Sequence, residues 1–229
     1  MRYGIYYVPA RDTPLAEFGS AILGYDLERA TDRERLNVPG LAEAQLARLT
    51  RRASRYGFHA TLKAPFALLA DRSRVDVLKL AADIADRCPA VEISGLEVAT
   101  LGDFIALTPQ RACPELDALA AAFVEGLDLL RAVQARDEVK WQPAKLSRRQ
   151  SELLDAWGYP YVFDQYRFHM TLTDPIPAQL AGPIRDALRR AAADAVGKPL
   201  TIDAVVVVEE SDPTAPFRGI ARLRLRGHR

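Results

Sequence analysis

One five-residue frame, Phe-His-x-Thr-Leu, occurs twice, and it constrains the fold of this chain more than any other feature. The first copy lies in RYGFHATLKAPF, residues 55–66, and the second in QYRFHMTLTDPI, residues 165–176. Only three histidines occur among the 229 residues, and the third, His228, lies next to the C-terminus. Two of three histidines in one frame predict an internal duplication, which the segments after each copy can test.

The segments that follow the two copies repeat the same order of elements. Each begins with an apolar stripe at helical spacing and continues into two β-runs joined by a turn. The turns are expected near Gly102 and near Pro213, and Gly197 is expected to cap the second helix. The two stripes consist of Val75, Leu78, Ala82 and Ala85, and of Leu180, Ile184, Leu188, Ala191 and Ala195. The chain therefore resembles two copies of one supersecondary unit.

The sequence predicts a duplicated, bilobal α+β fold, in which two antiparallel β-sheets line a central cleft and helices pack outside. The alternation in IARLRLR, residues 220–226, is typical of an antiparallel sheet with one solvated face. No low-complexity linker separates the halves, so we expect one domain, 1–229, with repeats at about 1–110 and 111–229. Further expected elements are a strand at 2–8 and a helix carrying Leu15, Phe18, Ile22 and Tyr25. Two more helices are expected at 114–130 and at 147–158, and the second of them starts with a capping box. A long connection from Asp26 to Ser54 is expected to contain one helix after Pro39.

Within each copy of the frame, the side chains divide between the two faces of a strand. Alternate residues of a strand share a face, so His59 points the same way as Thr61, and His169 the same way as Thr171. The remaining positions are apolar and face the other side: Phe58, Ala60 and Leu62, and Phe168, Met170 and Leu172. The apolar positions therefore anchor each strand, while the histidine and threonine project from the opposite face.

Two imidazoles on matching faces suit acid–base chemistry at phosphorus. A lone histidine on a strand is usually a structural group, but two at equivalent repeat positions can converge on one cleft. One ring can then remove a proton while the other supplies one, and threonine hydroxyls can donate to phosphoryl oxygens. No neighbouring cysteine or carboxylate cluster completes a zinc site, and a G-x-S-x-G elbow is absent. The motifs therefore predict phosphoester chemistry without a metal or other cofactor.

The charge balance and cysteine content argue against several other classes of protein. The formal net charge of +1 is too small for a protein that coats nucleic acid, so any phosphate recognition has to be local. Cys88 and Cys113 give no disulfide framework and are expected to be core thiols. The N-terminus lacks the apolar region of a signal peptide, and no apolar run reaches the roughly 18 residues of a membrane span. These features predict a cytoplasmic, water-soluble protein without membrane partners, expected to be a monomer.

Two H-x-T motifs, one in each half of a duplicated chain of this length, resemble the 2H phosphoesterase superfamily. The resemblance covers nearly the whole chain and implies a bilobal fold whose motifs face each other across a groove. It implies metal-independent opening of cyclic phosphodiesters, in several branches 2′,3′-cyclic nucleotides or RNA ends, with His59, Thr61, His169 and Thr171 as the catalytic residues. RYGFHATLKAPF and FHMTL, after RYGIYYVP, are similar to the phosphonate-metabolism branch, which implies a small phosphorylated sugar or nucleotide as substrate. Many RNA-acting members carry a basic residue shortly after the second motif, whereas this chain has Asp174.

Five further residues are candidates for substrate binding. By the alternation of a strand, three of them share the face of a motif histidine: Lys63, Arg167 and Thr173. For Lys63 the alternative of a surface lysine stays open. Tyr6 lies on the first strand, where either it or Tyr7 faces the cleft, and Arg218 lies beside the second hairpin, where it reaches either a ligand or solvent. The basic run from Arg48 to Arg55 is either a funnel for phosphates or a solvated face.

The sequence thus predicts a hydrolase that opens a cyclic phosphodiester of a small sugar phosphate or nucleotide, with phosphonate metabolism as its setting. Two alternatives stay open: a 2′,3′-cyclic phosphodiesterase acting on RNA ends, and a non-catalytic module that binds a nucleotide or sugar phosphate. Binding alone does not require two groups that titrate near neutrality, which favours the enzyme. Either histidine can be the base.

Overall fold

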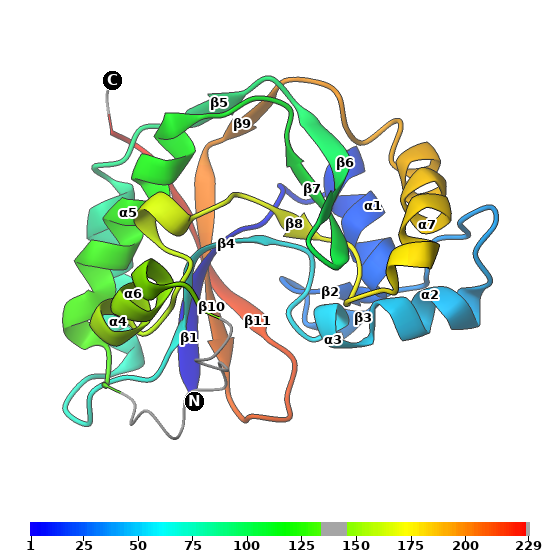
Figure 1. Ribbon diagram of the computed structural model, residues 1–229. Helices are drawn as coiled ribbons and strands as arrows, with labels where there is room; N and C mark the ends of the chain where they lie inside the picture. Colours follow the sequence, from blue (N-terminus) through cyan, green and yellow to red (C-terminus); the bar gives the residue numbers. More distant parts are fainter. Residues whose placement is uncertain (134–145, 228–229) are drawn as a thin grey trace.

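Seven antiparallel strands form one continuous sheet in the computed structural model, which describes residues 1–133 and 146–227 (Figure 1). Their order across the sheet is β11-β10-β1-β4-β8-β7-β6. The strands are β1 (Arg2–Tyr7), β4 (Ala60–Phe66), β6 (Leu96–Leu101), β7 (Phe104–Pro109), β8 (Met170–Thr171), β10 (Ala204–Glu210) and β11 (Arg218–Arg224). Two small sheets pair β2 (Tyr25–Asp26) with β3 (Thr31–Asp32), and β5 (Val91–Ile93) with β9 (Leu200–Ile202). His228 lies outside the described residues.

The hairpin of each half lies on the side of the sheet that holds the motif strand of the other half. The hairpin β6–β7, which follows the first motif, lies next to β8, which carries the second motif. The hairpin β10–β11, which follows the second motif, lies with β1 next to β4, which carries the first. Both predicted hairpins and the antiparallel α+β architecture are confirmed. The two groups of strands join through β4 and β8, which brings both motifs to the middle of one sheet.

The helices pack against the sheet face opposite to the motif histidines. α4 (Arg74–Ala85) packs on β10 and β11, α5 (Pro114–Leu127) on β4, and α7 (Ala178–Ala191) on β6 and β7 (Figure 1). One cluster of buried apolar side chains joins these helices to the sheet and includes Ala60, Phe123, Met170 and Leu188. The other helical elements of the described residues are α1 (Pro14–Leu23), α2 (Glu43–Leu49), α3 (Arg51–Ser54), α6 (Arg148–Trp157) and the 3-10 turns η1 (Asp128–Leu130) and η4 (Phe163–Gln165).

Capping residues set several helix ends where the sequence predicts them. Ser147 and Gln150 form the capping box that starts α6, and Gly158 ends this helix with a φ of 72°. Gly24 ends α1 with a φ of 71°, because a left-handed residue is needed there and glycine adopts it without strain. Tyr25, expected on that helix, therefore lies beyond its end, in β2.

The buried face of α4 differs from the predicted stripe. Ala85 is buried as predicted, but Val75 is 70% exposed, and the other buried residues are Val77, Ala81 and Ile84. This helix is apolar on more than one side, so its periodicity is ambiguous, and packing on α5 and the sheet selects the buried side.

Two other segments also differ from expectation. α7 ends at Ala191, so Gly197, with a φ of 83°, lies in the turn before β9 and does not cap the helix. Leu180, in the first turn of α7, is 49% exposed, while Ile184 and Leu188 are buried as predicted. The connection between β2 and β4 contains two helices, α2 and α3, where one was expected. Within the described ranges, no helix combines the length and apolarity needed to cross a membrane.

Candidate active site

The two H-x-T motifs lie on neighbouring antiparallel strands at the centre of the sheet. Ala60 of β4 is paired with Met170 of β8. The same register places the histidine of each motif opposite the threonine of the other. Directly opposite side chains have Cβ atoms about 5 Å apart, and diagonal neighbours about 7 Å apart. The four side chains that this register gathers on one face are His59, Thr61, His169 and Thr171.

The apolar positions of the two frames anchor this arrangement from the other side of the sheet. Six side chains are 5% exposed or less and belong to the main core: Phe58, Ala60, Leu62, Phe168, Met170 and Leu172. The predicted division of each frame into a buried face and a projecting face is therefore confirmed. Since both backbones are held by the core, the histidine and threonine positions are fixed relative to each other.

Each motif histidine is oriented by a carbonyl two residues earlier in the chain. Nδ1 of His59 lies 2.9 Å from the Gly57 carbonyl oxygen, and Nδ1 of His169 lies 2.8 Å from that of Arg167. A carbonyl only accepts hydrogen bonds, so Nδ1 carries the hydrogen in both rings. Nε2 is therefore the nitrogen that gains or loses a proton. Gly57 has a φ of 68°, and a Cβ there would lie 2.7 Å from the Leu27 side chain, so the turn that supplies this carbonyl requires glycine.

The two imidazoles have different surroundings. Nε2 of His59 lies 3.1 Å from the Thr61 hydroxyl, which donates to it, and the ring stacks on Tyr6 with 3.7 Å between centroids. Burial, the main cause, and the charge of His169 together lower the pKa of His59 to about 4, although the hydrogen bond with the Gly57 carbonyl opposes the shift. Burial also lowers the pKa of His169, whose ring packs at a tilt against Phe104, 5.6 Å between centroids. Because the charge of one ring affects the pKa of the other, the two histidines share one electrostatic environment.

Tyr6 is the predicted candidate that the structure places against a motif histidine. It lies opposite Thr61 in the β1–β4 register and is 1% exposed. Burial raises the pKa of its phenol well above the ordinary value, so the hydroxyl keeps its proton at neutral pH. Its ring closes one side of the site around His59. Tyr7, the alternative considered from the sequence, faces the main core.

Lys63 does not share the face of His59, because a β-bulge separates them. Ile5 is paired with Lys63, but Tyr6 is paired with Thr61, so Leu62 is an extra residue in β4. An extra residue reverses the alternation beyond it. The prediction that Lys63 lies in the cleft, which assumed regular alternation from His59 to Lys63, is therefore wrong.

The bulge directs Lys63 to the end of α5. Its Nζ donates to the Val124 carbonyl oxygen at 2.9 Å and lies 3.6 Å from the Asp128 carboxylate. The side chain is 4% exposed, and burial lowers its pKa to about 8 despite the opposing effect of Asp128. It therefore satisfies a carbonyl in the last turn of the helix, as a C-terminal cap.

Of the remaining predicted candidates, Thr173 and Arg218 have side-chain partners elsewhere in the fold. The Thr173 hydroxyl is buried and accepts the Ile105 amide at 3.0 Å, so it ends the strand pairing. Arg218 donates to the Glu209 carboxylate at 2.8 Å. The same carboxylate is close to Arg74 of α4, so the Arg218 side chain faces the helices. Arg167 is exposed, and its role in the site is the carbonyl that orients His169.

Asp174, the acidic residue after the second motif, has a structural partner. Its carboxylate accepts the backbone amides of Arg52 and Ala53, each at 2.8 Å, in the first turn of α3. A carboxylate at a helix N-terminus is stabilising, so this contact holds the segment after β8 against α3. The Asp174 carboxylate therefore has a structural role as the N-terminal cap of α3.

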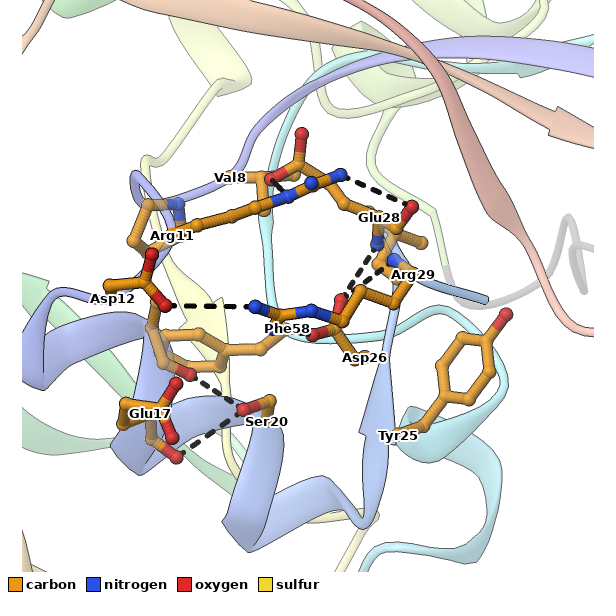
Figure 2. Close-up of a pocket in the computed structure, with 13 residues that line it drawn as sticks. Val8, Arg11, Asp12, Glu17, Ser20, Tyr25, Asp26, Glu28, Arg29 and Phe58 are labelled. Atoms are coloured by element: carbon orange, nitrogen blue, oxygen red, sulfur yellow. Dashed lines mark hydrogen bonds and ion pairs between the residues drawn. The ribbon is translucent and has the colours of Figure 1, made fainter. Parts of the chain in front are cut away.

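A separate cavity lies beside Phe58, the residue before His59, and its polar walls are paired with each other (Figure 2). Arg29 lies 3.6 Å from Asp12 and 2.7 Å from Asp26, and Arg11 lies 3.7 Å from Glu28. The first and third of these ion pairs join the loop after β1 to the segment between β2 and β3. Across the described part of the chain, no group of three or more histidine, cysteine, aspartate or glutamate side chains is arranged to hold a metal ion.

Several residues of the site could not be found from the sequence. Phe104 reaches His169 from β7, and Phe217 lies 6.2 Å from Tyr6, between centroids, from the turn before β11. The hairpin of Phe104 pairs directly with β8, and the hairpin of Phe217 pairs with β1, which in turn pairs with β4. Only the sheet order, which the sequence did not reveal, places them beside the motifs.

The fold and the site together define an α+β protein with two histidine–threonine pairs on adjacent central strands. The chain belongs to the family described as "Protein of unknown function (DUF1045)", whose model matches residues 61–218. A curated relative, "Ribose 1,5-bisphosphate phosphokinase PhnN" of Janthinobacterium sp. (strain Marseille), is 40% identical over 221 residues. The match covers 94% of this chain and 49% of the relative, so this chain spans about half the length of that protein.

Two solved structures with low sequence identity also resemble the whole chain. TT0787 of Thermus thermophilus has a TM-score of 0.48 at 13% identity, covering 100% of both chains. E. coli LigT complexed with 3′-AMP has a TM-score of 0.43 at 13% identity, covering 98% of this chain and 97% of that one.

Proposed function

We propose that this protein is a metal-independent phosphoesterase that opens a cyclic phosphodiester of a small sugar phosphate or nucleotide, with His59 and His169 as its acid–base pair. The observation that carries the proposal is the β4–β8 register, which sets each histidine opposite the threonine of the other motif. The Nδ1 of each ring is fixed by a carbonyl, so that both Nε2 atoms are available for proton transfer. A structural histidine does not require this repeated arrangement.

We assign His59 as the base and His169 as the acid. With a pKa of about 4, His59 is neutral at pH 7 and can act as the base. It removes a proton from water as the water oxygen forms a bond to phosphorus. The bond from phosphorus to the ring ester oxygen breaks, and this oxygen receives the Nε2 proton of His169. The negative phosphodiester raises the pKa of His169 when bound, which favours its protonated form. The products are a phosphomonoester and a free hydroxyl.

The threonines complete the site by contacting the non-bridging oxygens. Their hydroxyls lie on the same face as the rings and can donate to a phosphoryl oxygen. Thr61 donates to His59 in this structure, and it would turn to the phosphoryl group of a bound substrate. Two imidazoles and two hydroxyls thus supply both proton transfers and the oxygen contacts.

The name of the curated relative supports a sugar phosphate as substrate. Hydrolysis of a 1,2-cyclic phosphate of ribose 5-phosphate at the bond to O2 would yield ribose 1,5-bisphosphate, the compound in that name. The kinase activity in the name belongs to a protein twice as long, and the present sequence has no G-x-x-x-x-G-K-[ST] phosphate-binding loop. A cyclic phosphodiesterase that supplies the kinase with its substrate is consistent with both facts, and phosphonate metabolism is its proposed setting.

Substrate screening in the presence of EDTA tests the proposal. The panel consists of 5-phosphoribosyl 1,2-cyclic phosphate, 2′,3′-cyclic AMP and an RNA oligonucleotide with a 2′,3′-cyclic phosphate end. Formation of the monoester is followed by ³¹P NMR, and the double variant His59→Ala/His169→Ala is the control for contaminating activity. We expect turnover of the sugar phosphate with EDTA present. Turnover of the RNA end alone would support the RNA alternative, and binding of ligands without any turnover would support the non-catalytic module.

A further inference from the structure

Two arginines surround the carboxylate of Glu210 on the same sheet face as the histidines. The Glu210 side chain is buried, with 1% of its surface exposed. Arg2 donates to both of its carboxylate oxygens, from Nε to Oε2 and from Nη2 to Oε1, the latter at 2.9 Å. Arg55, four residues before His59, donates to the same carboxylate. Two guanidinium groups on one carboxylate leave a net positive charge on the cluster formed by Arg2, Arg55 and Glu210.

The cluster is connected to His59 by aromatic rings. β1 carries Arg2 and Tyr6 on one face, and four residues of strand separate their Cα atoms by about 13 Å. Phe217 fills the space between them, with its centroid 6.2 Å from Tyr6 and 5.6 Å from the guanidinium carbon of Arg2. Tyr6 in turn stacks on His59. The cationic cluster and the histidines are therefore joined by a row of buried aromatic rings on one side of the sheet.

Each arginine of the cluster retains a donor that no described residue accepts. Arg55 uses its Nε for the Ala215 carbonyl and its Nη2 for Glu210, and Arg2 uses Nε and Nη2 for Glu210. The two Nη1 groups have no partner within residues 1–133 and 146–227. The side chains of Arg2 and Arg55 are 26% and 25% exposed.

We propose that this cluster binds a second phosphate of the substrate, so that the preferred substrate is a cyclic phosphodiester with a phosphomonoester at the other end of its sugar. The inference rests on the proposed function and specifies its substrate class. Guanidinium groups suit phosphate oxygens because they present several donors in one plane, and Glu210 holds the two groups side by side. A nucleoside 2′,3′-cyclic phosphate has no such second phosphate and would leave the cluster unused.

The variant Arg55→Gln tests the proposal with two substrates that differ only in the second phosphate. They are 5-phosphoribosyl 1,2-cyclic phosphate and ribose 1,2-cyclic phosphate. Glu210 keeps Arg2 as its partner in this variant, so no buried carboxylate is left unpaired. We expect KM for the first substrate to rise roughly 10- to 100-fold, the usual value of a charged hydrogen bond, while kcat/KM for the second is unchanged. Equal losses on both substrates, or no loss on either, would overturn the proposal.

The matched control is Arg74→Gln. Arg74 and Arg218 share Glu209, the neighbouring carboxylate of β10, in a similar pair of ion pairs that faces the helices. Removing Arg74 should change neither kinetic constant. If both variants lose activity on both substrates in parallel with a lower melting temperature, the arginines around Glu210 act on the fold alone.

A binding measurement separates this inference from the proposed function. Ribose 5-phosphate, which cannot react, serves as the probe in isothermal titration calorimetry, with ribose as the control. Wild type and Arg74→Gln should bind it equally, and Arg55→Gln should bind it roughly tenfold more weakly or worse. This result would support the phosphate site even if no cyclic phosphate is turned over. Equal affinity of Arg55→Gln and wild type for the probe would reject the site even in an active enzyme.

Discussion

The phenol ring of Tyr6 lies almost flat on the imidazole of His59, with 3.7 Å between centroids and 18° between planes. Tyr6 removes one face of the imidazole from water, and desolvation is the main cause of the low pKa of His59. The stack therefore connects a buried residue of the first strand to the protonation state of the proposed base.

Tyr6→Leu should raise the pKa of His59 from about 4 towards its ordinary value of 6.5, because solvent would reach the exposed ring face. Titration of the His59 ring by ¹H–¹⁵N NMR measures this pKa directly. Tyr6→Phe is the matched control, since it keeps the ring and should leave the pKa low. A His59 pKa that stays near 4 in the leucine variant would assign the shift to other parts of the site.

Folding stability should depend on pH through His59. Its pKa is 6.5 when unfolded and about 4 when folded, so the unfolded state binds more protons between these values. The stability is therefore complete above pH 6.5 and decreases as the pH falls towards 4, by roughly 2–3 kcal/mol from this residue. Urea unfolding at several pH values gives the slope, which should be shallower in His59→Asn than in wild type. Identical slopes for the two proteins would contradict the low folded pKa.

Lys63→Met should affect the fold rather than the site. The ammonium contacts α5, η1 and the ring of Phe66 in its own strand, and Asp128 retains Arg131 at 2.7 Å when the lysine is removed. Replacing a buried, imperfectly paired charge by an apolar side chain of similar length changes stability by a few kcal/mol at most, in either direction. We expect kcat/KM to stay near the wild-type value once the protein is folded, as judged by circular dichroism. A large loss of kcat/KM in a fully folded variant would return Lys63 to the cleft.

The threonines should contribute less to catalysis than the histidines. Thr61→Val and Thr171→Val each remove one hydrogen bond to a phosphoryl oxygen. Such a bond contributes roughly 0.5–3 kcal/mol, with the higher values for a charged oxygen. Steady-state kinetics on the best substrate of the panel gives the comparison. Because valine keeps the shape of threonine, a loss greater than that of the histidine variants would mean that the hydroxyl takes part in proton transfer.

The sequence predicts local features well where the residue types in a short segment favour one local structure. The alternation in Phe-His-x-Thr-Leu, the capping box at Ser147 and Gln150, and the two hairpins all have the predicted form. Each of these depends only on neighbours in the chain. The same is true of the placement of the two motif histidines on the face opposite the core.

Features that depend on distant contacts were not predictable in the same way. The exchange of hairpins between the halves follows from the sheet order, and it brings Phe104 and Phe217 to the site. The bulge at Leu62, which turns Lys63 away, follows from the pairing of β4 with β1. Strand alternation carries no information about a bulge, because the extra residue is identified only by its partner strand.

The pH dependence of kcat/KM in the two single-histidine variants tests the acid–base pair most directly. Wild type should show a bell-shaped profile, rising through a pKa of about 4 as His59 loses its proton and falling as His169 loses its own, below the ordinary 6.5. His59→Ala should lose the rising limb and His169→Ala the falling limb, each with a rate roughly 10²–10⁴-fold lower. Full activity in either variant, or an unchanged bell in both, would contradict the assignment of these two histidines as base and acid.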